Sequence, residues 1–479
     1  MDTDVLVVGA GPTGMTLANE LLREGVATVL VDRLARRGEL SKAGGVQSRT
    51  LEALDQRGLL EPLLATGEHP VTTGHFAGIP LPHDPDRHRL PWRSVPQVAV
   101  EGFFEQHLAA HGLRARREHE LTGLAQDGAG VTAFFANGRS LRARYLVAAD
   151  GAHSTVRSLL GAAFPGEAGT LTIVAADVRL SGEPDTSHTW SEDGHWVAVF
   201  PIGTDQLGRP LRRLVFGGPG RSLPRDLPVT EDEIREALSI VFGTRVGLVE
   251  LRYARRITNA SRQVEQYRHG RVFLAGDAAH VHLPLGAQGM NTGMQDAFNL
   301  GWKLAAAVRG WAPDGLLDTY HAERHPVGAA VLRNVRAQSL LMDWSGTRDP
   351  EVVAARELFR DMAQLPAVQH YVADLMAGTA VRYPMPGADD HPLVGREASD
   401  RELGTGRLHA LLRSGRGILL DPADAHAATA ALWADRVDRV VAGADSGPML
   451  IRPDGYVCWA GANDPEKALT RWFGEPRTP

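Results

Sequence analysis

The sequence predicts an α/β protein in which a parallel sheet is interrupted by an antiparallel sheet and followed by a small terminal α/β unit. Three observations lead to this fold class. A strand, a glycine-rich turn, a helix and a second strand follow one another near the N-terminus. Short alternating segments fill residues 171–260, and further strand-like segments occur after residue 385. Strands that alternate with helices are typical of parallel sheets, whereas consecutive short strands are typical of antiparallel ones.

The composition limits the class of protein. A chain of 479 residues is too long for one ordinary core and indicates two or three domains. Its 43% hydrophobic and 23% charged residues are typical of a soluble globular protein, and no apolar run of membrane-spanning length is free of glycine, proline and charge. The net charge of −6 gives no reason to expect a nucleic-acid partner.

Two further features concern location and redox chemistry. Residues Met1–Asp4 are acidic and lead directly into a strand, so we expect no secretory signal, no membrane partner and a cytoplasmic protein. Cys458 is the only cysteine, which excludes an intramolecular disulfide and a cysteine metal cluster. No metal site is predicted.

The first predicted unit begins with an apolar strand at residues 4–8. The strand ends in Gly-Ala-Gly-Pro-Thr-Gly at residues 9–14, and an apolar helix face follows up to Gly25. Residues 27–31 form the next strand, with Asp32 at its end. Glycines at this spacing allow a tight turn and close approach of a pyrophosphate, and an acidic residue about 20 positions later binds a ribose. This pattern of strand, turn, helix and strand indicates a unit that binds FAD or NAD more strongly than it indicates an ordinary tight turn.

The next segments carry weaker signals. A glycine-containing loop and then a helix occupy residues 39–60, where Lys42 and Arg49 flank the loop and by themselves indicate surface charges. The segment of residues 71–95 alternates weakly and is broken by prolines, which predicts an excursion into another sheet.

Helices and strands are again predicted after residue 95. A helix is predicted from about Glu101 to Ala110, shortly after Gln97, and strands are predicted at residues 131–135 and 145–149. The sequence Ala-Asp-Gly-Ala-His-Ser-Thr-Val-Arg at residues 149–157 then leads from a strand through a turn into a helix.

Residues 171–260 predict an antiparallel sheet inserted into the first fold. Short alternating strands are expected at residues 173–178, 196–200 and 213–216, with turns between them. Several aromatic side chains in this region either line an apolar pocket or pack in the core of the sheet. They are Trp190, Trp196, Phe200 and Phe216.

Residues 272–309 predict a second anion-binding turn. The apolar strand of residues 272–274 runs into Gly276-Asp277 and a loop rich in proline and glycine, and a helix opens near Asn291-Thr292. The first backbone N–H groups of a helix have no internal partner, so this helix start favours an anion. Helices are expected to continue to about residue 375.

The remainder of the chain is expected to be a separate small unit. Residues 383–395 are interpreted as a linker, and residues 417–421, 437–441 and 449–451 as strands. Arg452-Pro453-Asp454-Gly455 predicts the turn of a hairpin. No CxxC motif is present, so we expect this unit to serve packing or dimer formation instead of thiol chemistry.

The three strand-to-turn motifs, taken together and in this order, resemble the fingerprints of flavin-dependent aromatic hydroxylases of the para-hydroxybenzoate hydroxylase fold. The resemblance is greatest to hydroxylases that modify aromatic polyketides such as angucyclines and anthracyclines. It is carried by residues 48–60, 74–81, 275–304 and 316–328, and by Arg-Pro-Asp-Gly-Tyr-Val-Cys-Trp near the C-terminus.

The resemblance implies three domains. A Rossmann-like FAD-binding domain would comprise residues 1–70, 97–170 and 262–335. An inserted antiparallel β-sheet domain that binds substrate would comprise residues 71–96, 171–261 and 336–384. A C-terminal thioredoxin-like domain would comprise residues 385–479.

The resemblance also implies site residues. Those expected to contact FAD are Gly9, Gly11, Pro12, Thr13, Gly14, Asp32, Arg33, Lys42, Arg49, Gln97, Asp150, Gly151, Gly276, Asp277, Pro284, Gly289, Met290 and Asn291. The backbone of Pro284, Gly286 and Gln288 would shape the flavin and oxygen site, and the substrate would contact His75, Trp196, Phe200 and Pro284. The helix start at Gly289–Asn291 would face flavin N1 and the C2 carbonyl, where reduced flavin carries negative charge.

Two residues depart from the pattern of the family. Lys42 stands where relatives usually carry an arginine, so the charge is kept but the bidentate geometry is lost, which predicts more mobile FAD. Ala287 stands where the common pattern has glycine, and we expect its β-carbon to be tolerated only at negative φ.

The implied activity is monooxygenation of a polycyclic phenol through a C4a-hydroperoxyflavin. FAD would be bound tightly but non-covalently, and NADPH or NADH and O₂ would be transient co-substrates. A base that deprotonates the phenol would help, but none of the candidate histidines is singled out. These are His75, His195, His280 and His282. The protein is expected to be a monomer or homodimer.

Three alternatives stay open at the level of sequence. One is Baeyer–Villiger oxidation of a polyketide, although the usual F-x-G-x3-H-x3-W motif is absent. Another is an antibiotic-inactivating hydroxylase that acts on a phenolic drug such as a rifamycin. The third is a non-catalytic protein that binds flavin or a drug, because a fold fixes the cofactor better than the function.

Overall fold

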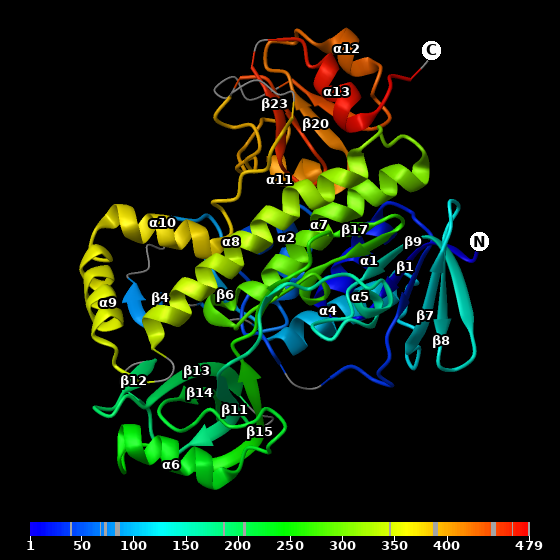
Figure 1. Ribbon diagram of the computed structural model, residues 1–479. Coiled ribbons are helices and arrows are strands. Elements are labelled where there is room, and N and C mark those ends of the chain that lie inside the picture. The colour runs from blue at the N-terminus through cyan, green and yellow to red at the C-terminus, as the bar shows by residue number, and fades with distance from the viewer. Residues whose placement is uncertain are drawn as a thin grey trace.

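The computed structural model describes residues 1–477, except residues 39–40, 68, 71–73, 82–86, 185–186, 205–206, 344–345, 387–390, 442–446 and 462. Figure 1 shows three regions: a parallel sheet with its helices, an antiparallel sheet at the opposite end from the C-terminus, and a small α/β unit that contains the C-terminus. In the part of the chain that is described, no helix is both long and apolar enough to cross a membrane.

The first region is built on a seven-stranded sheet with the main order β17-β18-β9-β1-β2. The strands are β1 (Thr3–Val8), β2 (Thr28–Val31), β9 (Ser140–Ala148), β17 (Arg268–His269) and β18 (Val272–Leu274), with β7 (Leu121–Gln126) and β8 (Val131–Phe135) attached through β9. β1 is parallel to β2 and to β9, and β18 is parallel to β9. The carboxyl ends of these four strands therefore lie at one edge of the sheet.

Three helices pack around this sheet. They are α1 (Pro12–Arg23), α4 (Gln97–Ala110) and α7 (Gln288–Arg309), and α1 contacts both of the others. Val5, Leu6 and Val7 of the central strand are fully buried. A strand covered on both faces must be apolar throughout, which explains the continuous apolar run at the N-terminus.

The antiparallel sheet expected for residues 171–260 is confirmed. Its order is β12-β13-β14-β11-β15, with every neighbouring pair antiparallel. The strands are β11 (Thr172–Leu180), β12 (His188–Trp190), β13 (Trp196–Thr204), β14 (Pro210–Gly217) and β15 (Leu248–Thr258). Alternation along β13 divides it between two cores, since Val197 and Val199 pack with α6 (Glu231–Phe242) whereas Trp196 and Ala198 face the other way.

The segment of residues 71–95 leaves the parallel sheet, as expected, and its described residues form two small ribbons of their own. β4 (Gly74–Phe76) pairs only with β5 (Ile79–Leu81), and β3 (His69–Pro70) pairs with β6 (Arg93–Ser94). Short ladders with prolines cannot supply the N–H donors of a central strand, so they stay as two-stranded ribbons. Residues 71–73 and 82–86 of the predicted segment lie outside the described residues.

A second apolar core lies between the two regions. It combines Phe76 of β4 and Trp196 of β13 with Leu283, Val335 and Val372. The last two belong to long helices that cross between the regions, as Figure 1 shows for α8. Val335 lies in α8 (Thr319–Met342) and Val372 lies in α10 (Pro366–Ala377), while α9 (Pro350–Met362) lies between them along the chain and adds Phe359 to the same cluster.

The C-terminal unit has a four-stranded sheet of order β21-β20-β22-β23. Its strands are β20 (Gly417–Leu420), β21 (Val437–Val440), β22 (Met449–Ile451) and β23 (Val457–Ala460), and its helices are α11 (Leu408–Leu411), α12 (Ala427–Ala431) and α13 (Glu466–Phe473). The predicted hairpin is confirmed, because β22 and β23 are antiparallel and Gly455 has φ +85° in the turn. Part of the predicted linker, residues 387–390, lies outside the described residues.

Several element boundaries differ from those predicted. The helix expected from Glu101 begins at Gln97, the strand expected from Tyr145 begins at Ser140, and the helix expected near Asn291 begins at Gln288. Several elements were not predicted individually, among them β7 and α6. The start of helix α6 can be recognised from the sequence, since Thr230 is its N-cap and Thr230 Oγ1 accepts a hydrogen bond from the Glu233 N–H.

Candidate flavin site

The candidate functional site lies at the carboxyl edge of the parallel sheet. The turns after β1, β2, β9 and β18 all reach this edge, and they contain most of the predicted cofactor residues. Ligands of open α/β sheets bind at this edge, because strand ends and helix starts present unpaired backbone groups there. The geometry of each turn decides whether a dinucleotide fits.

In the first turn, three glycines have different surroundings. Gly9 has φ +106°, and a Cβ on it would lie 2.2 Å from the Ala149 carbonyl oxygen. A Cβ on Gly14 would lie 1.9 Å from the Gly9 carbonyl oxygen, so both are required by close packing. A Cβ on Gly11 would meet nothing within 4 Å. Gly11 therefore borders open space at the start of α1, as a pyrophosphate site requires.

Asp32 stands at the end of β2 and supports the same turn. Its Oδ2 accepts a hydrogen bond from the Ala10 N–H at 2.8 Å, and its Oδ1 accepts one from the Leu34 N–H at 2.8 Å. The neighbouring Arg33 side chain is exposed. The carboxylate thus holds the turn and lies half-buried where an adenosine ribose is expected.

The turn after β9 contains an acceptor without a partner. Asp150 Oδ2 accepts from the Val156 N–H at 3.1 Å, while Oδ1 is buried and has no hydrogen-bond partner among the described residues. Burial raises the pKa of Asp150, although hydrogen bonds to Ser154 and Val156 oppose the rise. Gly151 has φ +82°, and a Cβ on it would meet nothing within 4 Å. A buried free acceptor beside open space fits a hydroxyl or amide of a bound cofactor.

The turn after β18 packs directly onto the first turn. Gly276 has φ +58°, and a Cβ on it would lie 2.6 Å from Thr13 Oγ1. A Cβ on Gly293 would lie 2.3 Å from the same atom. The Asp277 side chain is exposed although its neighbours are buried, so its carboxylate is available to a ligand.

The loop of residues 284–291 ends in the start of α7. Gly286 has φ +69°, and Ala287, the residue before the helix, has φ +53°. The expectation that Ala287 keeps negative φ is therefore wrong. The helix needs a left-handed residue to turn the chain into its first turn, and the Ala287 carbonyl is fixed by a hydrogen bond from Asn291 Nδ2 at 2.9 Å.

The same loop is tied to residues 45–47. Asn291 Oδ1 accepts from the Gln47 N–H at 2.9 Å, and Asn291 Nδ2 also donates to the Gly45 carbonyl at 3.0 Å. Gln47 Nε2 donates to the Gly286 carbonyl at 2.7 Å. The N–H groups of Gln288, Gly289 and Met290 form the first turn of α7, where a helix has no internal partners for them. Gln47 was not predicted as a site residue, and its polar side chain next to a glycine pair was the only signal.

Arg49 is placed differently from the prediction. Its guanidinium is buried and donates to Glu397 at 2.6 Å, to the Asp454 carbonyl at 3.0 Å and to Tyr456 Oη at 3.4 Å. It is neither a surface charge nor directed at the cofactor edge. The sequence could not show this, because its partners are about 350 or more residues away along the chain.

Lys42 and Gln97 lie together at the start of α4. Lys42 has an exposed side chain, and its backbone N–H donates to Gln97 Oε1 at 3.2 Å. Gln97 Nε2 donates to Glu101 at 2.7 Å. Gln97 therefore positions the backbone that carries Lys42, whose ammonium group is free to approach a phosphate.

Of the predicted substrate residues, Trp196 and Phe200 belong to the second apolar core and His75 lies against it, whereas Pro284 is exposed. The ring of His75 lies 4.3 Å from that of His188 and 6.1 Å from that of Phe200. Leu283 and Leu285, which flank Pro284, pack in the same cluster. The cluster thus connects the aromatic side chains of the antiparallel sheet to the loop before α7.

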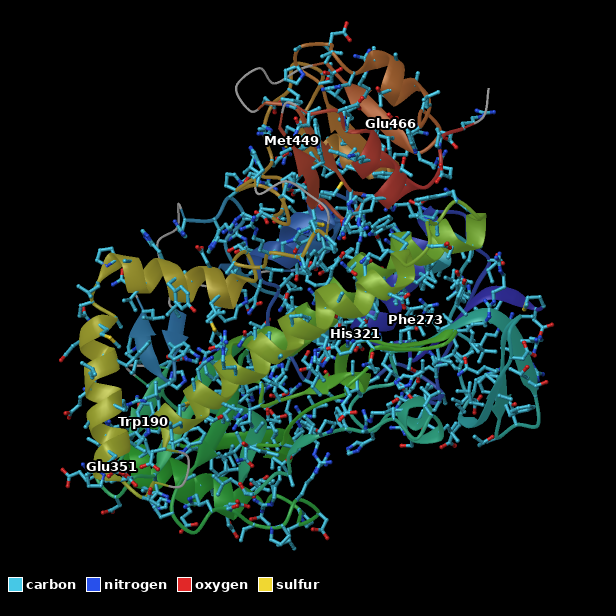
Figure 2. The ribbon with its side chains drawn as sticks, turned by 45° about the horizontal axis from the view of Figure 1, so that its top comes forward. Trp190, Phe273, His321, Glu351, Met449 and Glu466 are labelled. Carbon is cyan, nitrogen blue, oxygen red and sulfur yellow. The ribbon has the colours of Figure 1, made fainter. Side chains whose placement is uncertain are left out.

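Two residues of this cluster were not predicted to contact substrate. They are His188 and Trp190, whose rings are 6.1 Å apart. Figure 2 shows Trp190 next to α9, where Arg356 Cζ lies 4.9 Å from its ring centroid. Trp196 is only 2% exposed, which favours packing in the core, and Phe216 packs with α6 on the other face.

None of the four candidate histidines is arranged as an evident base. Burial lowers the pKa of His75 to about 4, and its Nδ1 accepts from the Gly78 N–H at 3.4 Å. His280 is buried against the Asp296 carboxylate at 2.8 Å. His282 Nδ1 donates to the Leu283 carbonyl at 2.6 Å, and His195 Nδ1 accepts from Arg221.

The fold and this edge define a dinucleotide-binding α/β protein with an open glycine cradle and a helix start for anionic groups. A model of the FAD-binding-domain family matches residues 2–335, and a model described as the C-terminal part of aromatic-ring hydroxylases matches residues 391–476. The chain belongs to this FAD-binding hydroxylase family, and it is an FAD-dependent monooxygenase.

Individual relatives agree with this assignment. A rifampicin monooxygenase of Streptomyces venezuelae is 42% identical over 480 residues, with 98% of both chains covered. A 12-dehydrotetracycline 5-monooxygenase/anhydrotetracycline 6-monooxygenase of Streptomyces rimosus is 41% identical, covering 99% of this chain and all of the relative. The solved structure of the anhydrotetracycline hydroxylase OxyS from Streptomyces rimosus superposes with a TM-score of 0.88 at 41% identity, covering 99% of this chain and 100% of that one.

Proposed function

We propose that the protein hydroxylates a polycyclic phenolic compound of the aromatic polyketide class, using FAD, NADPH or NADH, and O₂. One observation carries the proposal. The loop of residues 284–291 leads into the start of α7, and Leu285 within this loop and Leu283 just before it pack in the second apolar core. A flavin held by this loop would lie next to apolar rings that suit a flat aromatic substrate.

Bound FAD supplies electron transfer from the nicotinamide and activation of O₂. The chain itself provides binding and orientation. Gly11 would leave room for the pyrophosphate, Asp150 Oδ1 would accept a hydrogen bond from a hydroxyl of the cofactor, and the first N–H groups of α7 would stabilise negative charge on the ring system. The second apolar core keeps water from the reacting atoms.

His75 is proposed to hold the substrate as a hydrogen-bond donor. Its Nδ1 accepts from the Gly78 N–H, so the proton of the neutral ring resides on Nε2. A ring with a pKa of about 4 is neutral at physiological pH. The Nε2–H group can then donate to a phenolic or carbonyl oxygen, and deprotonation of the phenol is left to solvent.

We propose the same three domains that were expected from the sequence. Residues 1–70, 97–170 and 262–335 would bind FAD, residues 71–96, 171–261 and 336–384 would bind the substrate, and residues 385–479 would be thioredoxin-like. The strand order β21-β20-β22-β23, with one parallel and two antiparallel pairs, supports the last assignment. We also propose a cytoplasmic monomer or homodimer.

The experiment that tests the function is NADPH consumption by the purified yellow protein with a panel of tetracyclic phenols, followed by product mass. We expect several-fold stimulation by at least one phenol and a product heavier by one oxygen atom. Hydrogen peroxide is measured in parallel, because oxidation that yields only peroxide would contradict hydroxylation. The control is Gly11→Ala, because its methyl group would obstruct the pyrophosphate and weaken FAD binding.

A second candidate is hydroxylation of a rifamycin-type antibiotic that inactivates the drug. This candidate is supported by the relative named rifampicin monooxygenase, which is 42% identical to this chain. Rifampicin is therefore added to the panel, and resistance of an expressing strain is compared with that of a Gly11→Ala strain. Product NMR separates ring hydroxylation from Baeyer–Villiger oxidation, since only the latter converts a carbonyl into an ester.

A further inference from the structure

Two loops that border the flavin site are connected through the C-terminal unit. One is the turn at Gly276, whose N–H donates to Asp296 Oδ2 at 3.0 Å. The other is the segment of residues 45–47, which is hydrogen-bonded to Asn291 and precedes Arg49 in α2 (Ser48–Asp55). Each of these two loops is linked, through hydrogen bonds of buried side chains, to Tyr383 or to the hairpin of residues 452–456.

The first route runs through Arg324 of α8. Arg324 Nε donates to Asp296 Oδ1 at 2.7 Å, and its Nη2 donates to the Thr292 carbonyl in the first turns of α7 at 3.0 Å. Its Nη1 donates to Tyr383 Oη at 3.0 Å. Asp296 and Arg324 are at most 1% exposed. Burial alone would raise the pKa of Asp296, but Arg324 and His280 lower it, so the carboxylate stays ionised.

The second route starts at Arg49 and meets the first at a pair of tyrosine rings. Arg49 Nε donates to Tyr456 Oη, and Arg49 Nη2 donates to the Asp454 carbonyl. The rings of Tyr456 and Tyr383 are stacked with centroids 4.1 Å apart. The pair therefore stands between two arginines that belong to the two sides of the flavin site.

The hairpin that carries Tyr456 is itself anchored to α8. Arg452 donates to Glu323 at 2.6 and 2.9 Å and to Asp454 at 2.6 and 3.0 Å. Figures 1 and 2 show this unit seated on α8 and α7, away from the antiparallel sheet, with Met449 of the neighbouring strand labelled. Because Glu323 and Arg324 are adjacent, the hairpin and the route to Gly276 are fixed to the same turn of α8.

We propose that the stacked pair Tyr383–Tyr456 is a positioning element of the flavin site, through which the C-terminal unit sets the placement of the Gly276 turn and of the α7 start. Neither tyrosine touches the cofactor edge. Tyr383 orients Arg324, which in turn binds Asp296 and the Thr292 carbonyl. Tyr456 orients Arg49, which follows the segment of residues 45–47 along the chain. The proposal depends on FAD binding at this edge.

The test uses Tyr383→Phe, which keeps the stacked ring but removes the acceptor of Arg324. We expect FAD to dissociate about tenfold more readily, as loss of a buried hydrogen bond to a charged group predicts. The midpoint potential of the bound flavin should become more negative, because a displaced α7 start stabilises the reduced anion less. Tyr456→Phe removes the acceptor of Arg49 and should change both quantities in the same direction.

Val457→Ala is the matched control. It removes buried methyl groups from the adjacent strand position without touching either tyrosine hydroxyl, and should lower the melting temperature while leaving FAD affinity and potential unchanged. Wild-type affinity and potential in both tyrosine variants, or equal changes in Val457→Ala, would overturn the proposal. Failure of the wild-type protein to bind FAD would instead overturn the assignment of the cofactor, so the two results are distinguishable.

Discussion

Single residues at the flavin edge differ in whether packing or ligand binding requires them. Gly14 has no room for a side chain, since a Cβ would lie 1.9 Å from a backbone oxygen. Gly11 has room and a φ of −86°, which any residue adopts. The two glycines of one motif therefore serve different purposes, and substitution separates them.

Gly11→Ala should leave the stability of the apoprotein within about 0.5 kcal/mol of wild type, because the new methyl group meets no protein atom. Its affinity for FAD should fall at least tenfold. Gly14→Ala should lose both stability and affinity. Thermal melting of the apoproteins and fluorescence titration with FAD check these outcomes, and normal FAD affinity of Gly11→Ala would contradict the placement of the pyrophosphate.

His75 predicts a pH dependence of stability. Its pKa is lowered by burial to about 4 in the folded protein, from about 6.5 when unfolded. The unfolded chain therefore binds the extra proton between these values, and stability falls as pH decreases from about 6.5 to 4, by up to about 1.4 kcal/mol per pH unit.

Urea unfolding of wild type and His75→Gln at pH 7 and pH 5 measures this contribution. We expect the loss of stability on acidification to be smaller in His75→Gln. An identical pH dependence in the two proteins would show that His75 is not buried in its neutral form.

At the scale of elements, the start of α7 determines the site. The helix begins at Gln288 because Gly286 and Ala287 both take the left-handed conformation before it. Glycine adopts this conformation without cost, whereas alanine loses about 1–2 kcal/mol. The loop that would border the flavin therefore contains local strain at Ala287.

Ala287→Gly should raise the free energy of unfolding by up to about 1 kcal/mol, since removal of the strain exceeds the added entropy of the unfolded chain. Ala307→Gly, in the last turns of the same helix, should lower it by about 1 kcal/mol. Denaturant unfolding of both variants checks the contrast, and equal destabilisation would contradict the left-handed conformation at residue 287.

At the scale of the whole molecule, buried ion pairs join the C-terminal unit to α7 and α8. Arg452, Glu323, Lys303 and Asp454 are at most 2% exposed. Burial raises the pKa of Glu323, but Arg452 and Lys303 lower it to about 2. This carboxylate therefore contributes stability above about pH 4.5 that is lost as pH falls toward 2.

Arg452→Met should destabilise the protein by about 3–5 kcal/mol, because it leaves buried carboxylates without their main partner. Arg416→Met, which removes a surface pair with Asp438 in the same unit, should cost less than about 1 kcal/mol. Urea unfolding measures both. A small effect of Arg452→Met would mean that water replaces the guanidinium.

Local patterns in the sequence predict the parts of this protein that depend on neighbouring residues. The turn of residues 9–14, the Gly276-Asp277 turn and the hairpin at residues 452–455 follow from glycine, proline and apolar spacing over a few positions. The antiparallel sheet was predictable for the same reason, and α6 would have been found from its N-cap Thr230 and the acidic residues that follow it.

Contacts between side chains that are distant along the chain depend on long-range packing. Arg49 pairs with Glu397, Tyr383 stacks on Tyr456, and His75 packs against His188, although none of these pairs is close in sequence. Ala287 takes a left-handed conformation that its residue type disfavours. Local propensities are worth tenths of a kcal/mol to about 1 kcal/mol per residue, whereas burial and pairing of charged groups are worth several, so long-range packing prevails wherever the two disagree.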